Sequence, residues 1–190
     1  LASYKQALKD GAYSTFIGSP LSEGLFQFDL WDVKPSNKYD WDGLRKKIME
    51  SGVRNSLVIA LMPTASTSQI LGNNECIEPL TSNIYSRRTI AGNFIIVNKY
   101  LLNDLISINL WSNTIKDEII RNGGSIINIE SIPKVFQNLY KTSWDLSQKT
   151  LIDQSADRGI YICQSQSLNL WLENPDFQKL TLIMLDYHPF

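Results

Sequence analysis

The fold is indicated by one stretch, Ser56-Leu57-Val58-Ile59-Ala60-Leu61-Met62, together with the Pro63-Thr64-Ala65-Ser66-Thr67 that follows it. The first part is a short, continuous apolar run, which is typical of a strand covered on both faces. Pro63 ends the run, and small, mostly hydroxylated residues follow. Ser68 to Leu71 then restarts a helical turn before Gly72. The stretch therefore predicts a strand, a tight polar loop and a short helix.

Helical and strand-like segments alternate on both sides of this stretch. Their boundaries come from capping residues, from apolar residues at helical spacing and from terminating glycines. Strands that alternate with helices favour an α/β architecture with mainly parallel strands. The predicted segments are a helix capped by Asp40 and ended by Gly52, a strand over Phe94–Val97, helices over 101–106, 112–124 and 133–159, and a strand over Ile160–Cys163.

The composition is that of a core-forming protein. The chain has 190 residues, of which 43% are hydrophobic and 19% are charged, so one domain of ordinary size is expected. The 18 basic and 19 acidic residues nearly cancel and form no block of one sign. We therefore expect neither DNA nor a membrane surface as a partner.

The two cysteines favour a reducing compartment. Cys76 and Cys163 are far apart and match neither a metal nor a redox spacing, so two free thiols are expected. Cys163 lies in an apolar pattern and should be buried and unreactive. The first ten residues contain Lys5, Lys9 and Asp10 and predict neither a signal peptide nor a membrane span. A cytoplasmic protein is the expectation, and the single His188 does not suggest a metal site.

The segment Thr64–Thr67 has the properties of a phosphate-binding loop. It stands between a strand and a helix start, where backbone N–H groups lack partners and the helix dipole favours an anion. Its Ser and Thr residues add hydroxyl donors. Small hydroxylated residues also cap helices where no ligand is bound, so the pattern alone leaves plain capping open as an alternative.

A longer set of motifs carries a resemblance to a known family. The chain resembles the large subunit of eukaryotic-type class I ribonucleotide reductases over roughly Tyr13 to Thr181. The matching motifs are Gly52-Val53-Arg54-Asn55, Pro63-Thr64-Ala65-Ser66-Thr67-Ser68-Gln69-Ile70-Leu71-Gly72-Asn73-Asn74-Glu75, Glu78-Pro79, Thr81-Ser82-Asn83-Ile84-Tyr85-Ser86-Arg87-Arg88, Tyr140-Lys141-Thr142, Gln148-Lys149-Thr150, Ala156-Asp157-Arg158-Gly159 and Gln164-Ser165-Gln166-Ser167-Leu168-Asn169.

The resemblance implies a fold, an activity and a substrate site. It implies that residues 1–181 are a portion of the family's ten-stranded catalytic α/β barrel, incomplete in this chain. Residues 182–190 depart from the family pattern and are expected to be a divergent tail. The family reduces ribonucleoside diphosphates to 2′-deoxyribonucleoside diphosphates by a thiyl-radical mechanism. The resemblance assigns Pro63, Thr64, Ala65, Ser66 and Thr67 to binding of the substrate diphosphate.

The resemblance also implies what the chain does not carry. The family's radical cysteine, its redox cysteine pair and its paired tyrosines match no residue here, so Cys76, Cys163 and Tyr187 receive no catalytic role. Both ends of the chain are expected to be cut. An intact enzyme would need a small subunit with a metal-generated radical, a thioredoxin or glutaredoxin reductant and nucleotide effectors. It would form a homodimer or larger assembly of the large subunit. The alternative is a non-catalytic phosphate-binding or interaction module related to the barrel.

The isolated 190 residues are expected to bind ADP or CDP at millimolar concentrations or not at all, and to show no turnover. Three or four charge-assisted hydrogen bonds contribute at most about 5 to 12 kcal/mol. Association itself costs about 4 to 15 kcal/mol, which leaves little net affinity. Isothermal titration calorimetry measures this affinity directly, and a micromolar dissociation constant for either nucleotide would contradict the expectation.

Overall fold

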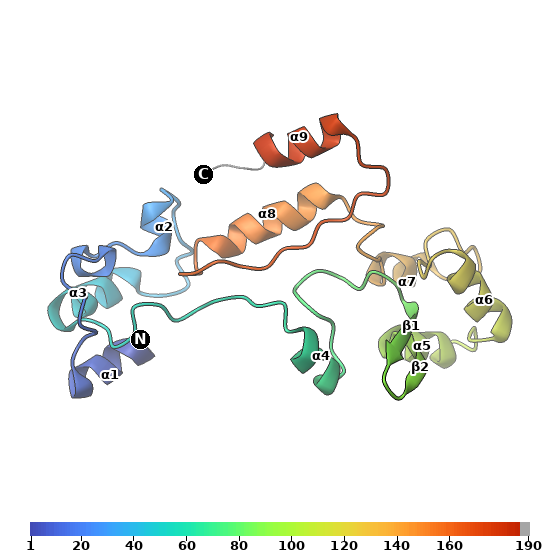
Figure 1. Ribbon diagram of the computed structural model, residues 1–190, viewed down its shortest axis with the longest axis horizontal. Coiled ribbons are helices and arrows are strands. Elements are labelled where there is room, and N and C mark those ends of the chain that lie inside the picture. Colours follow the sequence, from blue (N-terminus) through green and yellow to red (C-terminus); the bar gives the residue numbers. More distant parts are fainter. Residues whose placement is uncertain (187–190) are drawn as a thin grey trace. The chain divides into compact units, whose positions relative to one another are not determined.

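A computed structural model describes residues 1–186 of the chain (Figure 1). The chain divides into two compact units. Unit 1 comprises Leu1–Met62 and Gln154–Ser167, and unit 2 comprises Pro63–Asp153 and the segment from Leu168 onward. Each unit has a hydrophobic core of its own. Tyr187 and His188, which were considered above, lie outside the described residues.

Unit 1 is built from short helices. Its core contains Phe16, Ile48 and Val53, each of which is buried. The predicted helix after Asp40 is confirmed, because the Asp40 carboxylate accepts a hydrogen bond from the Gly43 N–H at 2.8 Å and caps it. The elements are α1 (Ala2–Asp10), a 3-10 turn η1 (Pro20–Glu23), α2 (Gln27–Leu30) and α3 (Trp41–Ser51).

An ion pair joins two of these helices. Arg45 on α3 donates to both carboxylate oxygens of Asp29 on α2, from Nη1 at 2.9 Å and from Nη2 at 3.1 Å. The Phe26 N–H donates to the same carboxylate at 2.7 Å. The hydrogen bonds from Arg45, with that from Phe26, hold the pKa of Asp29 below its usual value despite partial burial. The bidentate geometry fixes α2 against α3.

Unit 2 contains most of the regular structure. The helices predicted over 101–106 and 112–124 are confirmed, and the Ser112 hydroxyl caps the second by accepting from the Ile115 N–H at 3.2 Å. Leu101, Leu105 and Ile119 are fully buried between these helices. The elements are α4 (Ala65–Leu71), β1 (Ile84–Thr89), β2 (Gly92–Val97), α5 (Lys99–Ser107), α6 (Asn113–Arg121), α7 (Lys134–Leu139) and α9 (Phe177–Asp186), and α8 (Gln148–Gly159) begins in unit 2 and ends in unit 1.

Asn83 is the polar centre of unit 2. Its side chain is 2% exposed, and its Nδ2 donates to the carbonyls of Gly124 at 3.1 Å and Tyr140 at 2.9 Å. Its Oδ1 accepts from Asn98 Nδ2 at 2.9 Å. The amide therefore joins the start of β1 to the ends of α6 and α7 and to the start of α5. Because the Asn83 side chain is itself removed from water, these hydrogen bonds satisfy its polar atoms and are favourable in place.

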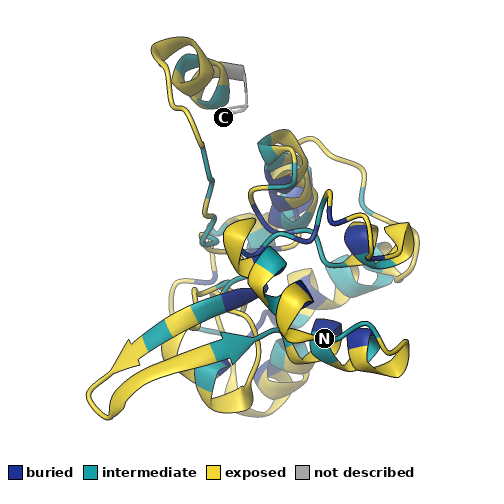
Figure 2. Cartoon of the chain, turned by 90° about the vertical axis from the view of Figure 1, so that its right-hand side faces the viewer, coloured by how far each residue is buried: buried dark blue, intermediate teal, exposed yellow. Residues whose placement is uncertain are grey.

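The sheet differs from the prediction of parallel strands. β1 and β2 pair as an antiparallel hairpin, with Ile84 opposite Val97, and most of the hairpin is exposed (Figure 2). The strand over Phe94–Val97 is thus confirmed, but its neighbour runs antiparallel. In the part of the chain that is described, the only parallel contact is a single bridge between Leu61 and Gln166.

The predicted strand over residues 56–62 does not form within the described residues. The segment is extended, but it pairs only at Leu61, and Leu57 and Val58 are 51% and 63% exposed. A strand covered on both faces needs hydrogen-bonded neighbours and packing layers, and the described residues supply one neighbour at one point. The apolar pattern was identified correctly, but its predicted burial is wrong for this chain.

Two further predictions are wrong. The helix over 133–159 is interrupted between α7 and α8, because the Ser143 N–H donates to the Leu80 carbonyl and its hydroxyl donates to the Pro79 carbonyl. These tertiary bonds replace helical ones. The segment Ile160–Cys163 is a turn and not a strand, since the N–H groups of Tyr161 and Ile162 bond back to the end of α8.

Asp29→Asn is expected to lower the free energy of unfolding by about 1 to 2 kcal/mol at pH 7, since it removes the charge from a partly buried bidentate pair. The pKa of Asp29 is lowered in the fold, so this stability is present above the unfolded pKa of 3.8 and is lost as pH falls through the folded value. Urea denaturation at pH 7 and pH 3 measures both effects.

The matched control is Asp153→Asn. Asp153 pairs with Lys149 on α8, and both side chains are more than half exposed, so the change should be below about 0.5 kcal/mol. Equal losses for the two variants would contradict the importance of the Asp29 pair.

Candidate functional site

The segment Pro63–Thr67 lies exposed at the beginning of α4 in unit 2. The prediction placed the helix start at Ser68, whereas the helix already begins at Ala65, so that Ala65, Ser66 and Thr67 form its first turn. No hydrogen bond is made by the backbone N–H groups of these three residues within the part of the chain that the structure describes. Their donors are available to an external acceptor.

Thr64 precedes the helix in a strained conformation. Its φ of 56° and ψ of 29° are left-handed, which is unfavourable for a β-branched residue. Its hydroxyl donates to the Pro63 carbonyl at 2.7 Å and does not cap the helix. Plain capping by Thr64, the alternative that the sequence left open, is therefore wrong in this structure.

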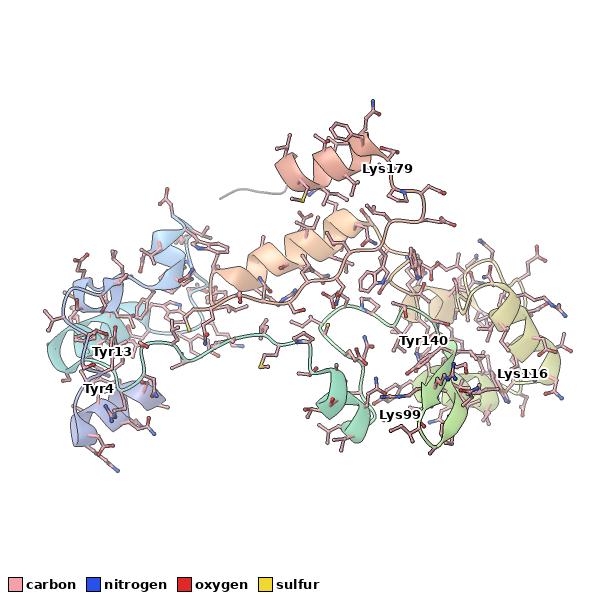
Figure 3. All side chains as sticks on the ribbon, in the orientation of Figure 1. Tyr4, Tyr13, Lys99, Lys116, Tyr140 and Lys179 are labelled. Atoms are coloured by element: carbon pink, nitrogen blue, oxygen red, sulfur yellow. The ribbon has the colours of Figure 1, made fainter. Side chains whose placement is uncertain are left out.

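Side chains from the hairpin region hold α4 from its side and its end. Arg87 Nη1 on β1 donates to Gln69 Oε1, and Gln69 Nε2 donates to Glu75 Oε1 at 2.9 Å. Lys99, labelled in Figure 3, donates from Nζ to the Gly72 carbonyl at 3.3 Å, just after the helix ends. Neither cation contacts the first turn of α4. Gln69 and Lys99 were not singled out from the sequence, because nothing in their local pattern indicates a contact across more than a dozen residues.

The two cysteines occupy different settings. Cys76 in unit 2 accepts a hydrogen bond from Asn169 Nδ2 at 3.1 Å. In unit 1, Cys163 accepts from the N–H groups of Val58 at 3.0 Å and Ile59 at 3.2 Å. Both cysteines are thiols that are partly exposed. The prediction of a buried Cys163 is wrong, because the extended segment it contacts is itself exposed.

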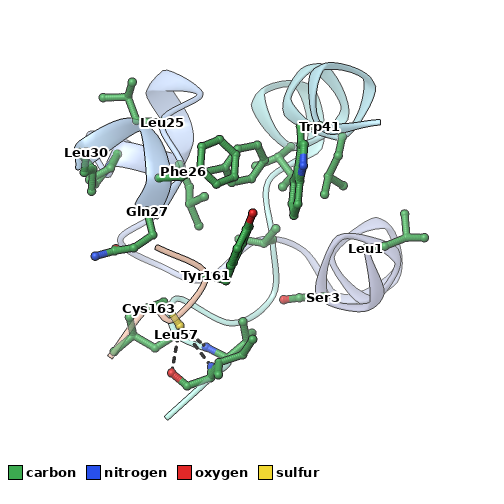
Figure 4. Close-up of a pocket in the computed structure, with 18 of the residues that line it drawn as sticks. Leu1, Ser3, Leu25, Phe26, Gln27, Leu30, Trp41, Leu57, Tyr161 and Cys163 are labelled. Atoms are coloured by element: carbon green, nitrogen blue, oxygen red, sulfur yellow. Dashed lines mark hydrogen bonds between the residues drawn. The ribbon is translucent and has the colours of Figure 1, made fainter. Parts of the chain in front are cut away.

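A cavity of about 740 Å³ lies in unit 1 and contains none of the loop residues. Figure 4 shows Tyr161 inside it between Phe26 and Trp41, with Cys163 at its edge. Tyr161 stacks on Trp41 at 6.1 Å between ring centroids. The exposed apolar side chains of Leu57, Val58 and Ile59 complete the lining. The cavity is thus mainly apolar and lies beside the extended segment 56–62.

Neither a metal-ligand cluster nor a membrane-spanning helix is present in residues 1–186. There, no three His, Cys, Asp or Glu side chains are grouped as metal ligands would be. Nor does any helix in that range combine the length and hydrophobicity that crossing a bilayer requires.

Comparison with known proteins identifies the class. The ribonucleotide reductase barrel domain family matches residues 1–188, so the chain belongs to that family. The chain is 54% identical over 180 residues to the ribonucleoside-diphosphate reductase large subunit of Arabidopsis thaliana, covering 95% of this chain and 22% of that protein. It is 56% identical over 181 residues to the large chain of Cryptosporidium parvum, with the same coverage.

A solved structure agrees with this assignment. The class Id ribonucleotide reductase alpha subunit of Actinobacillus ureae matches 98% of this chain and 28% of its own length, with a TM-score of 0.68 and 25% sequence identity. The predicted fold class, an incomplete part of the reductase α/β barrel, is confirmed. The chain spans about a fifth of the length of these two curated relatives.

Thr64→Asn is expected to raise the free energy of unfolding by about 0.5 to 1 kcal/mol, because Asn tolerates the left-handed conformation better than a β-branched residue. Thermal denaturation followed by circular dichroism measures the shift. Thr67→Asn, placed inside the first turn of α4, is the control and should be neutral or slightly destabilising. Destabilisation by Thr64→Asn would show that Thr64 is not strained.

Proposed function

We propose that this chain is part of the catalytic large subunit of a ribonucleotide reductase, which reduces ribonucleoside diphosphates to 2′-deoxyribonucleoside diphosphates by a thiyl-radical mechanism. The observation that carries the proposal is the family match over residues 1–188. Identities of 54% and 56% to reductase large subunits support it. A non-catalytic module related to the barrel is the competing function, and no contact in the structure favours it.

Within that function, Pro63–Thr67 binds the diphosphate of the substrate. Three observations support this role: the segment is exposed, it immediately follows the extended segment 56–62, and the N–H groups of Ala65, Ser66 and Thr67 have no partner among the described residues. The hydroxyls of Ser66 and Thr67 add further donors. Because water solvates these groups in the free protein, a phosphate replaces water without breaking protein hydrogen bonds.

This chain contributes substrate positioning and not the radical chemistry. The radical cysteine, the redox cysteine pair and the paired tyrosines would lie in other parts of the large subunit. A small subunit would supply the metal-generated radical, and a thioredoxin or glutaredoxin would supply electrons. Nucleotide effectors and a homodimer or larger assembly complete the proposal, with the cytoplasm as its location.

A negative charge in the first turn of α4 has opposite effects on phosphate binding and on helix stability. A carboxylate in the first turn of a helix interacts favourably with the unpaired N–H groups and stabilises the helix. The same carboxylate repels a diphosphate that uses those groups. One substitution therefore separates the two roles.

Ser66→Asp in a full-length large subunit carrying this segment is expected to leave the melting temperature unchanged or slightly raised and to raise KM for CDP or ADP at least about tenfold. Two like charges about 4 Å apart repel by about 1 to 4 kcal/mol at a protein surface. Steady-state reduction assays with the small subunit present measure KM, and differential scanning calorimetry measures stability.

Ser66→Asn is the matched neutral variant and should change KM by less than about threefold, the effect of one net hydrogen bond. Equal KM values for the Asp and Asn variants would reject the loop as the diphosphate site. Absence of ribonucleotide reduction by the wild-type subunit, assayed with its small subunit and a reductant, would reject the reductase function itself.

A further inference from the structure

The diphosphate loop is tied to a second turn that follows α4. The Cys76 N–H donates to the carbonyl of Pro63 at 2.9 Å, directly before the strained Thr64. The Asn73 N–H donates to the carbonyl of Ser68 at 2.8 Å, which closes the C-terminal end of α4 at the point where the 73–76 turn begins. Cys76 is itself left-handed, with φ of 59°. Strained backbone persists only where the surroundings over-determine it, so the 73–76 turn is what holds Thr64 in place.

The buried carboxylate of Glu78 anchors the 73–76 turn. Glu78 is 5% exposed, and its Oε1 accepts the backbone N–H of Asn169 at 3.0 Å. The Glu78 carbonyl accepts from Asn74 Nδ2 at 2.5 Å. Asn169 then returns to the turn through its side chain, where Nδ2 donates to Cys76 Sγ at 3.1 Å. A continuous hydrogen-bonded path therefore runs from Glu78 through Asn169 and Cys76 to Pro63.

The burial of Glu78 has a cost that its contacts must offset. The second carboxylate oxygen, Oε2, is buried and has no hydrogen-bond partner among the described residues. Leaving a buried polar atom unpaired destabilises a fold. In return, Glu78 holds Asn169 against the 73–76 turn. Asn169 is 93 residues from Cys76 in sequence, so no local structure would bring the two together.

We infer that Glu78, acting through Asn169 and Cys76, is a positioning residue for the diphosphate of the nucleotide substrate. The inference rests on the proposed diphosphate role of Pro63–Thr67. Glu78 touches neither that loop nor the substrate, and its effect is to fix the carbonyl of Pro63 and hence the direction of the N–H groups that follow Thr64. It governs recognition of the phosphates, while recognition of base and sugar does not depend on it.

The test uses a full-length large subunit carrying this segment, assayed with its small subunit. Glu78→Ala is expected to raise KM for CDP about tenfold, and Asn169→Ala about threefold, which are the factors for a charge-assisted and a weak neutral hydrogen bond. Inhibition by cytidine, which has no phosphate, should change by less than about twofold in both variants. A general loosening of the site would weaken cytidine and CDP together.

Two controls, Glu78→Gln and Asn103→Ala, make the result decisive. Glu78→Gln keeps the acceptor for the Asn169 N–H and should restore KM to within about threefold of wild type. Asn103→Ala, an exposed asparagine on α5 with no side-chain hydrogen bond among the described residues, should behave as wild type. Asn169→Ala alters an exposed side chain, so it remains informative if Glu78→Ala fails to fold.

The outcomes separate the two proposals. An unchanged KM for CDP in both folded variants, or equal losses for Glu78→Ala and Glu78→Gln, would overturn the positioning role. Ser66→Asp would still report on the loop in that case. If Ser66→Asp leaves CDP binding intact, the loop assignment fails, and the positioning role fails with it.

Discussion

The structure depends on one constraint: the extended segment 56–62 needs hydrogen-bonded neighbours along both edges. Within the described residues it finds a bridge from Leu61 to Gln166 and two N–H bonds, from Val58 and Ile59, to the sulfur of Cys163. Its apolar side chains stay exposed beside the cavity of unit 1. A barrel closes its sheet so that each strand has two neighbours. Because Pro63 follows this segment directly, the completed barrel would also hold the start of the segment that we propose binds the diphosphate.

Unit 2 buries its apolar side chains and pairs its central polar groups through contacts within the unit itself. Its core of buried Leu and Ile residues packs α5 against α6, and the Asn83 amide closes the ends of four elements. Burial together with the hydrogen bond to Asp104 raises the pKa of Tyr140 to about 12. Upstream of Pro63, the segment 56–62 pairs only at Leu61 among the described residues. Downstream, the contacts of Arg87 with Gln69 and of Lys99 with Gly72 hold α4 within unit 2.

This division explains which features could be predicted from the sequence. α3, α5 and α6 were predicted because a cap and an apolar spacing are local, and Asp40 and Ser112 act within one turn. The helix over 133–159 was wrong because the bonds of Ser143 to Leu80 and Pro79 join distant residues. The assignment of Pro63–Thr67 to the substrate diphosphate came from motif and resemblance, and it stays a prediction. The path from Glu78 to Asn169 was not predicted, since no periodicity relates positions so far apart.

The geometry of Thr64 leaves the first turn of α4 without a side-chain cap. A capping hydroxyl accepts a hydrogen bond from the first turn and so consumes a donor. The Thr64 hydroxyl instead donates to the carbonyl of Pro63, which leaves the N–H groups of Ala65 to Thr67 to solvent. A multiply charged phosphate would form stronger, charge-assisted hydrogen bonds with these donors than water does, which would offset the cost of removing that water. The strain at Thr64 is then the consequence of keeping that turn open, and the buried Glu78 lies at the far end of the contacts that maintain it.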